Sequence, residues 1–556
     1  MASLLGIPIE VLLSVLSDLP NRDIKKVRLV CKYLKAVAPF RLNRVFLSPH
    51  PRDIKVLQAI AADDTYRKRI VEIVYDDTRL PHFMAPWEVH DQDEEDWFQQ
   101  WEDMDGYDPV PEGIPSWFYR MSKQSIECVD GYSANRLPRP DLTELAQRLQ
   151  FRLSMRDCYK LYQKIVEEQE EGIEAGMDKE ALELGLKRFP NLRRVTVTPV
   201  AHGVPFIPWY ETPTIRSFPA GFVYPIPYGW PEMTLHSNKP FVEPWDSKHE
   251  KSKWRGLCLV LRTLAQQPHN VTEFVLDTNH RYTGLNAYMF HEENSEYNDL
   301  VSLLRSPGFS RLDIALFAGG GSSTAWPWYH GNMIKKALMH AKDLRHLSFS
   351  GNANDQFLGY GRNFEGEEEH FFPLRSIFPV EQWANLVHFG LSGFVVRVDD
   401  LTGLLAALPE TLRSVDLSFL CFLGAESGDH SSLLANMRSK LGWRQRPVSE
   451  RPRITLRLDQ DQQEVAQFLD VSAAAEDFVY GDGLNPFGEP GEQGGRRGNI
   501  VYDEQEMATK RWSFHPANDL LYAKRHRLMD LGLVKKEDWY LRGEHLKWGL
   551  RAKTAS

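Results

Sequence analysis

Short apolar stretches with one spacing recur along the chain from about residue 190 onward. In the clearest copy, Leu344, Leu347 and Phe349 stand at the first, fourth and sixth positions, and Asn352 follows. Because alternate residues of a strand point to opposite faces, this spacing predicts a strand that buries one face. The middle positions of the copies are Val195, Phe274, Leu312, Leu347, Phe389 and Val415, with a weak last copy at Ile454.

Helical apolar spacing fills the intervals between these stretches. The predicted helices cover 257–265, 299–304, 333–341, 401–408 and 433–441, and a longer helical region covers 142–186. Strand followed by helix, repeated, predicts an α/β fold with a parallel sheet and helices behind it. The copies are typical of leucine-rich repeats interrupted by insertions, so we expect an irregular leucine-rich-repeat-like α/β solenoid. A doubly wound single sheet is the alternative.

Residues 1–47 are predicted to form a compact unit of short helices. Pro8 suits a first helical turn, and the apolar residues that follow recur at helical spacing up to Leu19. Pro20 and Asn21 break this helix, and Asp23 can cap the next one. So short a unit buries little surface, which predicts that it needs a neighbour or a partner for stability.

The ordered motifs of this unit resemble the F-box family, in its fungal form. The motifs are Ile7-Pro8-Ile9-Glu10-Val11-Leu12, Leu16-Ser17-Asp18-Leu19 and Arg28-Leu29-Val30-Cys31-Lys32. Ile7 stands where Leu is usual, and Leu34 stands where Trp is frequent. The stretch 41–80 also looks like the fungal set.

The resemblance implies that the helical unit binds the Skp adaptor of a cullin–RING ubiquitin ligase of the SCF type. The residues expected to face the adaptor are Ile7, Pro8, Leu12, Leu16, Leu29, Val30 and Leu34. The protein would then be a non-catalytic substrate receptor, whose solenoid holds a target protein near the ubiquitin-conjugating enzyme. A scaffold that acts without ubiquitin transfer is the alternative, and an unrecognised enzyme is a third class.

Five segments follow from these patterns. They are an F-box-like helical domain at 1–47, a linker strand and helix with an acidic aromatic insert at 48–140, the solenoid at 141–478, a Gly-rich flexible loop at 479–499 and a helical C-terminal cap at 500–556. The proline-rich stretch 199–244 interrupts the solenoid. Because proline removes ladder donors, we expect a long structured loop there rather than further strands.

Charge is concentrated in one place. The net charge is -10, and the segment 84–112 holds eleven acidic residues and no Lys or Arg. This balance argues against a general nucleic-acid binder, and no apolar run is long enough for a membrane span. The insert is predicted to be a solvated loop outside the core, with a docking element for a basic surface as the alternative.

The cysteines and the N-terminus indicate a reducing compartment. Five cysteines with no C-x-x-C spacing form neither a disulfide framework nor a zinc-finger signature. Residues 1–20 favour an amphipathic helix over a signal peptide, because Glu10 and Asp18 interrupt the apolar stretch. We therefore expect a cytoplasmic or nuclear protein.

No motif in the sequence argues for catalysis, a cofactor or a metal. A P-loop, a G-x-S-x-G elbow and an H-E-x-x-H zinc helix are all absent from the sequence. The glycines at 319–321 follow a predicted strand but lack the spacing of a nucleotide-binding loop.

Target recognition is expected on the concave sheet face, where the residues between the buried positions of each strand point outward. That row comprises Thr196, Glu273, Asp277, Asp313, His346, Ser348, His388, Ser392, Ser414, Asp416 and Arg457. From it we select Glu273, Asp277, Asp313, His346, His388 and Asp416 as the substrate-binding residues. Their acidity suggests a partner that is basic or rich in hydrogen-bond donors. The alternative is that the proline-rich loop covers this face and nothing binds there.

Overall fold

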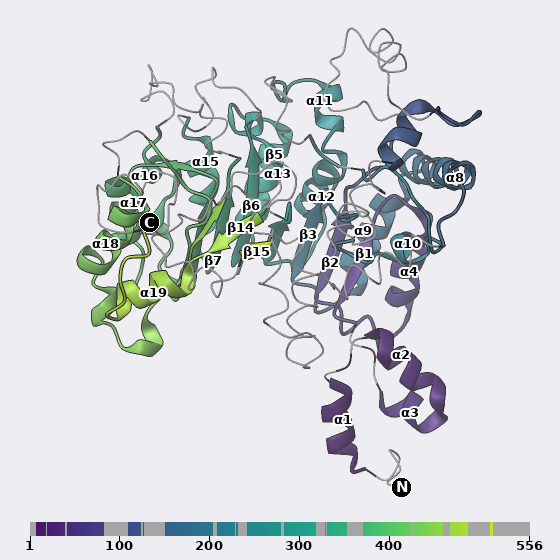
Figure 1. Cartoon of the computed structure of the whole chain (residues 1–556), viewed down its shortest axis with the longest axis horizontal. Helices are drawn as coiled ribbons and strands as arrows, with labels where there is room; N and C mark the ends of the chain where they lie inside the picture. Colours follow the sequence, from purple (N-terminus) through teal and green to yellow (C-terminus); the bar gives the residue numbers. More distant parts are fainter. Residues whose placement is uncertain are drawn as a thin grey trace, which may run out of the picture.

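A computed structural model supplies the structure (Figure 1). It describes residues 7–82, 109–123, 126, 151–203, 208–231, 242–279, 283–318, 329, 331–352, 371–423, 428–459, 467–487 and 512–514, apart from positions 18, 20, 39, 41 and 228. The acidic stretch 84–108 and most of the predicted C-terminal cap therefore lie outside the described residues.

The fold is α/β, and its main sheet is parallel, as the sequence predicts. The strands follow the chain in order: β1 (Arg44–Leu47), β2 (Glu72–Asp76), β3 (Arg194–Thr198), β4 (Glu273–Leu276), β6 (Arg311–Phe317), β7 (His346–Ser350), β8 (His388–Ser392), β10 (Ser414–Asp416) and β12 (Arg453–Thr455). The short strand β5 (Leu285–Asn286) extends the pairing of β6, and β9 (Val395–Val396) pairs with β11 (Cys421–Phe422). A doubly wound sheet reverses its strand order midway, and this sheet does not.

The register of the sheet agrees with the predicted spacing. Val195 is the Cα partner of Phe274, and Phe274 is the partner of Leu312. The same row continues through Leu347, Phe389, Val415 and Ile454. The middle positions of all seven predicted copies therefore lie side by side across the sheet.

Two strands at the start of the sheet were not predicted as copies of the repeat. Val45 of β1 pairs with Ile73 of β2, and Ile73 pairs with Val195. The sheet therefore begins at residue 44, and the predicted boundaries at 47 and 141 are wrong. The helical unit ends before β1, and much of the predicted linker belongs to the main sheet and its helices.

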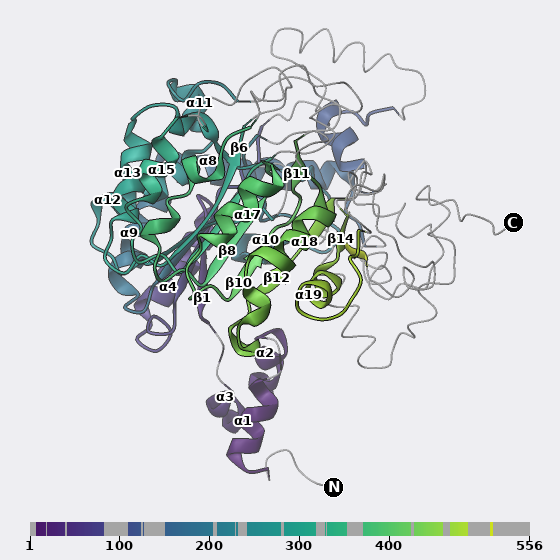
Figure 2. The ribbon, with the colours of Figure 1, turned by 90° about the vertical axis from the view of Figure 1, so that its left-hand side faces the viewer.

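A single run of helices accompanies the strands in the same order (Figure 2). These helices are α4 (Pro51–Ala62), α9 (Met177–Arg188), α12 (Arg255–Gln266), α13 (Ser295–Leu304), α15 (Met333–Leu338), α16 (Leu374–Ile377), α17 (Val398–Ala406), α18 (His430–Lys440) and α19 (Ser472–Tyr480). Each helix contacts the next one. Every strand–helix unit is thus stacked between its sequence neighbours.

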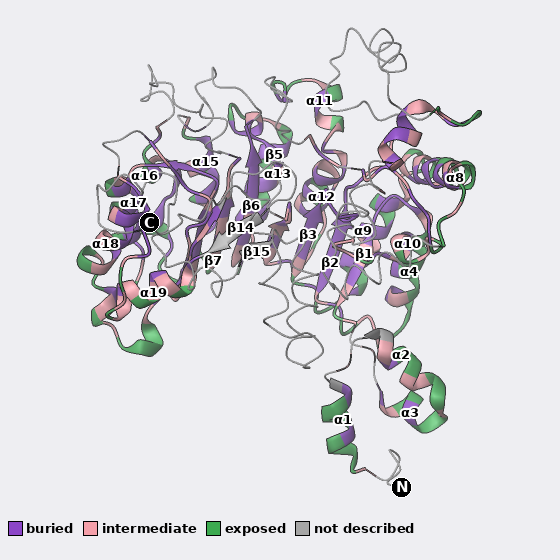
Figure 3. Ribbon diagram, in the orientation of Figure 1, coloured by how far each residue is buried: buried purple, intermediate pink, exposed green. Residues whose placement is uncertain are grey.

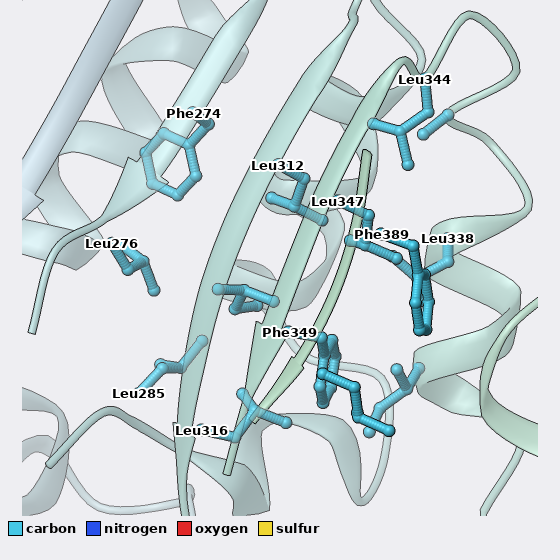
Figure 4. Packing of buried hydrophobic residues seen from close by; sticks show 14 of the residues in the cluster. Phe274, Leu276, Leu285, Leu312, Leu316, Leu338, Leu344, Leu347, Phe349 and Phe389 are labelled. Atoms are coloured by element: carbon cyan, nitrogen blue, oxygen red, sulfur yellow. The ribbon is translucent and has the colours of Figure 1, made fainter. Parts of the chain in front are cut away.

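The core lies between the sheet and these helices (Figures 3 and 4). Leu312, Leu347 and Phe389 come from adjacent strands and are fully buried, and Leu338 of α15 packs in the same cluster. Burying one strand face against the helices leaves the alternate residues on the opposite face. We call that opposite face, which carries residues such as Thr196 and Asp313, the polar face.

The last strand of the sheet has its outer edge covered by α19. The Ile454 backbone N–H donates to Glu476 Oε1 at 2.8 Å, and the Leu456 N–H donates to Ser472 Oγ at 3.0 Å. The Val471 N–H donates to the Leu456 carbonyl in return. Side chains of a helix therefore take the place of a further strand.

A small antiparallel sheet follows the main one. It consists of β13 (Arg457–Asp459), β14 (Gln467–Asp470) and β15 (Trp512–Phe514), with β14 in the middle. The predicted cap over 500–556 was expected to be helical, whereas the three residues described there form a strand. In the predicted Gly-rich loop at 479–499, the first two residues belong to α19.

The N-terminal unit consists of α1 (Ile9–Ser17), α2 (Asn21–Val30) and α3 (Lys32–Val37), as the sequence predicts (Figure 1). Its own small core is separate from the main one and centres on Leu12, Leu16 and Leu34. The Phe40 carbonyl accepts a hydrogen bond from Arg69, just before β2, at 3.1 Å. This bond links the unit to the first strands of the sheet.

A second small core joins the residues that follow the acidic segment, from Ile114 to Phe118, to the proline-rich loop. It forms on α8 (Met155–Glu174), where Trp117 and Phe118 pack around Tyr162 together with Phe222 of the proline-rich stretch. The described part of that stretch includes α10 (Pro213–Arg216), and α11 (Lys248–Ser252) follows it. Trp117 and Phe118, which follow the acidic segment, are thus structural.

Candidate functional site

The N-terminal unit exposes more apolar surface than a unit of this size needs to. The large apolar side chains in contact with solvent are Ile9, Val11, Leu13, Val15, Leu29, Val30 and Tyr33. Leu29 and Val30 are 81% and 72% exposed, respectively. In α1 the exposed residues flank the stripe of Leu12 and Leu16, because nearly the whole helix is apolar and only one stripe faces the core. This surface makes the N-terminal unit a candidate interaction site.

The structure divides the seven predicted adaptor-facing residues into two groups. Pro8, Leu29 and Val30 are exposed, and Ile7 is half-buried. The other three, Leu12, Leu16 and Leu34, are buried with Ile24 and Ala38 and form the core of the unit. Three short helices must bury their largest apolar side chains against one another, so these three do not face outward in the isolated chain. The assignment of the seven residues to the adaptor stays a prediction.

A ladder of charged side chains runs across the polar face where the strands begin. Arg44 Nε donates to Glu72 Oε2 at 2.7 Å, and Thr196 Oγ1 donates to Glu72 Oε1 at 2.7 Å. One strand further, Arg194 Nε donates to Glu273 Oε2 at 2.6 Å. Side chains directly opposite on neighbouring strands lie within reach of one another, so the parallel register produces these pairs.

The ladder continues into a cluster on β6, β7 and β8. Arg311 Nη2 donates to Asp313 Oδ2 at 2.5 Å, and His346 Nε2 lies 3.1 Å from Asp313 Oδ1. The His346 and His388 rings stack with their centroids 4.1 Å apart. Residues predicted from separate copies of the repeat are thus brought together in space.

The pKa values within this cluster follow its geometry. Burial, assisted by the neighbouring His346, lowers the pKa of His388 to about 4, so this ring is neutral at pH 7. Burial alone would raise the pKa of the Asp313 carboxyl, but hydrogen bonds from His346 and Arg311 outweigh it and lower that pKa. Asp313 therefore stays ionised beside its two donors.

The cluster is not arranged as a nucleophilic triad. Ser348 Oγ lies 3.3 Å from His346 Nε2, but Asp313 meets that same nitrogen rather than Nδ1. In a triad the carboxylate orients the histidine through the nitrogen that does not face the serine. The Nδ1 atom of His388 lies 2.8 Å from Ser414 Oγ, so its neighbour there is a serine and not the carboxylate that a triad requires.

Two kinds of feature are absent from the described ranges. No three His, Cys, Asp or Glu side chains there come together as a metal-binding group. Over the same residues, none of the helices combines the length and the apolar character that crossing a membrane requires.

The proline-rich loop reaches the polar face at its first strands. The Tyr210 hydroxyl donates to Asp277 Oδ2 at 2.5 Å, and its ring meets Phe46 of β1 edge-on at 6.0 Å. Thr196, between these two strands, is only 2% exposed. Burial raises the pKa of Asp277, although the Tyr210 hydrogen bond opposes this. The loop therefore covers the face around Asp277 and Phe46, whereas Arg44 at the edge of the same face remains 40% exposed.

The predicted acidic residues all have partners within the chain. Glu273 is held by Arg194, Asp277 by Tyr210, and Asp313 by Arg311. Asp416 accepts from Ser418 and lies 3.8 Å from Arg457. The premise of a basic partner, that these carboxylates are free, is therefore wrong. Glu273 pairs with Arg194 on the adjacent strand, Asp313 pairs with Arg311 on its own strand, and Asp277 accepts from Tyr210 of the proline-rich loop.

The arginines at the starts of the strands were not predicted from the sequence as functional residues. Arg193, Arg345 and Arg413 each stand two positions before the middle residue of a predicted copy, and Arg311 and Arg453 stand one position before. The same alignment that identified the strands contains this signal.

The chain matches no protein-family model, and no curated protein shows significant similarity to it.

Proposed function

We propose that this protein is the substrate receptor of an SCF-type ubiquitin ligase, with the N-terminal unit binding the Skp adaptor and the strand–helix stack holding a target protein. The observation that carries the proposal is the exposed apolar surface on α1 to α3, which coincides with motifs in F-box order. Leu29 and Val30, within the closing motif, are its most exposed members.

The remainder of the chain supports a role in binding. Consecutive strand–helix units, each stacked on the next, are typical of leucine-rich-repeat-like solenoids, which present long faces to other proteins. The proposal assigns positioning to the protein and leaves the chemistry of transfer to other subunits. It places the work of the receptor in the cytoplasm or the nucleus.

Binding to a purified Skp adaptor tests the proposal. Leu29→Asp with Val30→Asp places charges in the proposed interface and is expected to weaken adaptor binding by about tenfold or more, since buried anchors often contribute over 1 kcal/mol each. Val448→Asp is the matched control, because Val448 is 78% exposed but lies far along the chain in the main body. A truncation should remove residues 1–40 only, because β1 begins at Arg44.

The outcomes separate the two functions considered. Loss of adaptor binding in the double variant, with the control unchanged, supports the receptor. Equal binding by all three folded proteins refutes it. Recovery of the adaptor without a cullin from extracts favours the non-catalytic scaffold instead.

A further inference from the structure

Arginines are concentrated along the edge where the parallel strands of the main sheet begin. The first residues of the nine strands form one continuous row of Cα partners from Arg44 to Arg453. Taken with the residue before each, these positions hold seven arginines and two glutamates. The arginines, which we call the arginine edge, are Arg44, Arg193, Arg194, Arg311, Arg345, Arg413 and Arg453, and the glutamates are Glu72 and Glu273.

The acidic members of the row lie beneath the basic ones. The Glu72 side chain is 8% exposed, whereas that of its partner Arg44 is 40% exposed. Glu273 is 14% exposed, and Arg193, which lies 3.5 Å from it, is 62% exposed. The carboxylates therefore fix the guanidinium groups in place while the cationic side of each pair remains at the surface.

Other arginines of the edge have no acidic partner among the described residues. Arg345 and Arg453 are both exposed, and no ion pair is found for either within that part of the chain. Arg413 is directed to backbone carbonyls of its own loop, at Glu410 and Leu412. The edge thus carries net positive charge in a chain whose net charge is -10.

We propose that the arginine edge binds an acidic segment of a partner protein. This inference rests on the function proposed above: the acidic segment is the element by which the target protein is recognised. Guanidinium groups pair with carboxylates through two parallel hydrogen bonds, so carboxylates are the matching groups on the partner.

The spacing of the edge favours an extended polypeptide. Arg44, Arg194 and Arg311 lie on alternate strands, because the single strands between them begin with glutamate. Neighbouring strands are about 4.8 Å apart, which places these arginines about 10 Å apart. A chain in the polyproline II conformation has three residues per turn and rises about 3.1 Å per residue, so every third side chain lies on one side, about 9 Å from the next, and would meet an arginine. Nucleic-acid phosphates are more closely spaced and would also meet the interleaved glutamates.

The test uses the full-length protein and three labelled probes. The first is an extended Gly/Ser peptide with glutamate at every third residue, the second has glutamine in those positions, and the third is single-stranded oligothymidylate. Arg345→Glu with Arg453→Glu reverses two exposed charges and is expected to weaken binding of the glutamate peptide by about tenfold. Raising the salt concentration should weaken it as well.

Matched variants keep the result interpretable. Lys160→Glu with Lys336→Glu makes the same change in net charge at exposed sites on α8 and α15 and should leave binding unchanged. Arg345→Gln with Arg453→Gln removes the same charges without reversing them, and should give a smaller loss if the reversed pair fails to fold. Thermal unfolding verifies the fold of each variant.

The inference is overturned if the glutamate and glutamine peptides bind equally, or if the control pair weakens binding as much as the edge pair does. Tighter binding of oligothymidylate would assign the edge to nucleic acid and also overturns it. Peptide binding that requires deletion of residues 84–108 would identify the chain's own acidic segment as the occupant, against a partner protein. Adaptor binding, measured on the same variants, should not change, so loss of the receptor function and loss of this surface are distinguishable.

Discussion

Asp76, at the end of β2, should make the protein less stable as the pH rises. Its carboxyl is 4% exposed and accepts a hydrogen bond from the Thr78 backbone N–H at 2.9 Å. Burial raises its pKa to about 8, the Thr78 hydrogen bonds oppose this, and the nearby Asp53 and Asp77 carboxyls add to the rise. The folded protein therefore keeps a proton on Asp76 at pH values where the unfolded chain has lost it.

The sign and size follow from proton linkage. A carboxyl whose pKa is raised by folding favours the folded state at low pH, and this contribution is lost as the pH rises from about 4 to about 8. The difference between the ordinary value of 3.8 and about 8 corresponds to at most about 6 kcal/mol, at about 1.4 kcal/mol per pH unit. Asp76→Asn keeps an oxygen acceptor for Thr78 and does not titrate, so it should remove this loss.

The assay is urea denaturation followed by tryptophan fluorescence at several values between about pH 5 and about pH 9. The free energy of unfolding of the Asp76→Asn protein should exceed that of the parent by about 2 kcal/mol at about pH 5, and the excess should grow by about a further 4 kcal/mol by about pH 8. Buried groups that do not interact with Asp76 titrate alike in both proteins and cancel in the difference, whereas Asp53 and Asp77 are coupled to Asp76 and contribute to it. Asp482→Asn is the control, because the Asp482 side chain is 94% exposed. A difference between variant and parent that stays constant across this range would refute the reasoning.

Three further changes test the packing described above. Gly256→Ala should lower the free energy of unfolding by about 2 kcal/mol or more, despite the helix preference of alanine, because the new Cβ would lie 2.3 Å from Tyr75 Cε1; an unchanged urea midpoint would contradict the close approach. Tyr210→Phe leaves the buried Asp277 carboxyl without its hydroxyl donor and should cost about 1–3 kcal/mol, more at pH 8 than at pH 5, by denaturation at both values. Leu347→Ala, in the centre of the sheet, should cost about 2–5 kcal/mol in the same assay, and a loss below 1 kcal/mol would show that the site collapses around the cavity.

The repeat was predictable from the sequence because one strand face is buried in every unit. The alternation of apolar and polar residues follows directly from this one-sided burial. It correctly predicted that Val195 and Leu347 belong to one row of neighbours across the sheet. The same pattern is present at Val45 and Ile73, but the stretch that contains them was attributed to the F-box resemblance. Those two strands were therefore recoverable from the sequence.

The chemistry of the polar face was less predictable. The carboxylate of Glu273 looks free in the sequence, and its partner Arg194 lies 79 residues away. Whether a charge is available depends on which strand stands next to it, and only the sheet order supplies that information. The division of α1 into buried and exposed apolar residues likewise depends on α2 and α3, because its apolar residues cover more of the helix than the stripe that those two helices bury.

The covered edge at β12 limits how the molecule can associate with copies of itself. Parallel sheets with an open last strand offer unpaired N–H and C=O groups to any extended chain, which is a common route to fibrous aggregates. In this protein Glu476 and Ser472 occupy the outward N–H groups of that strand, so sheet extension from this end would first require α19 to detach. Damage to this single helix would thus be expected to appear as loss of solubility before any loss of the sheet itself.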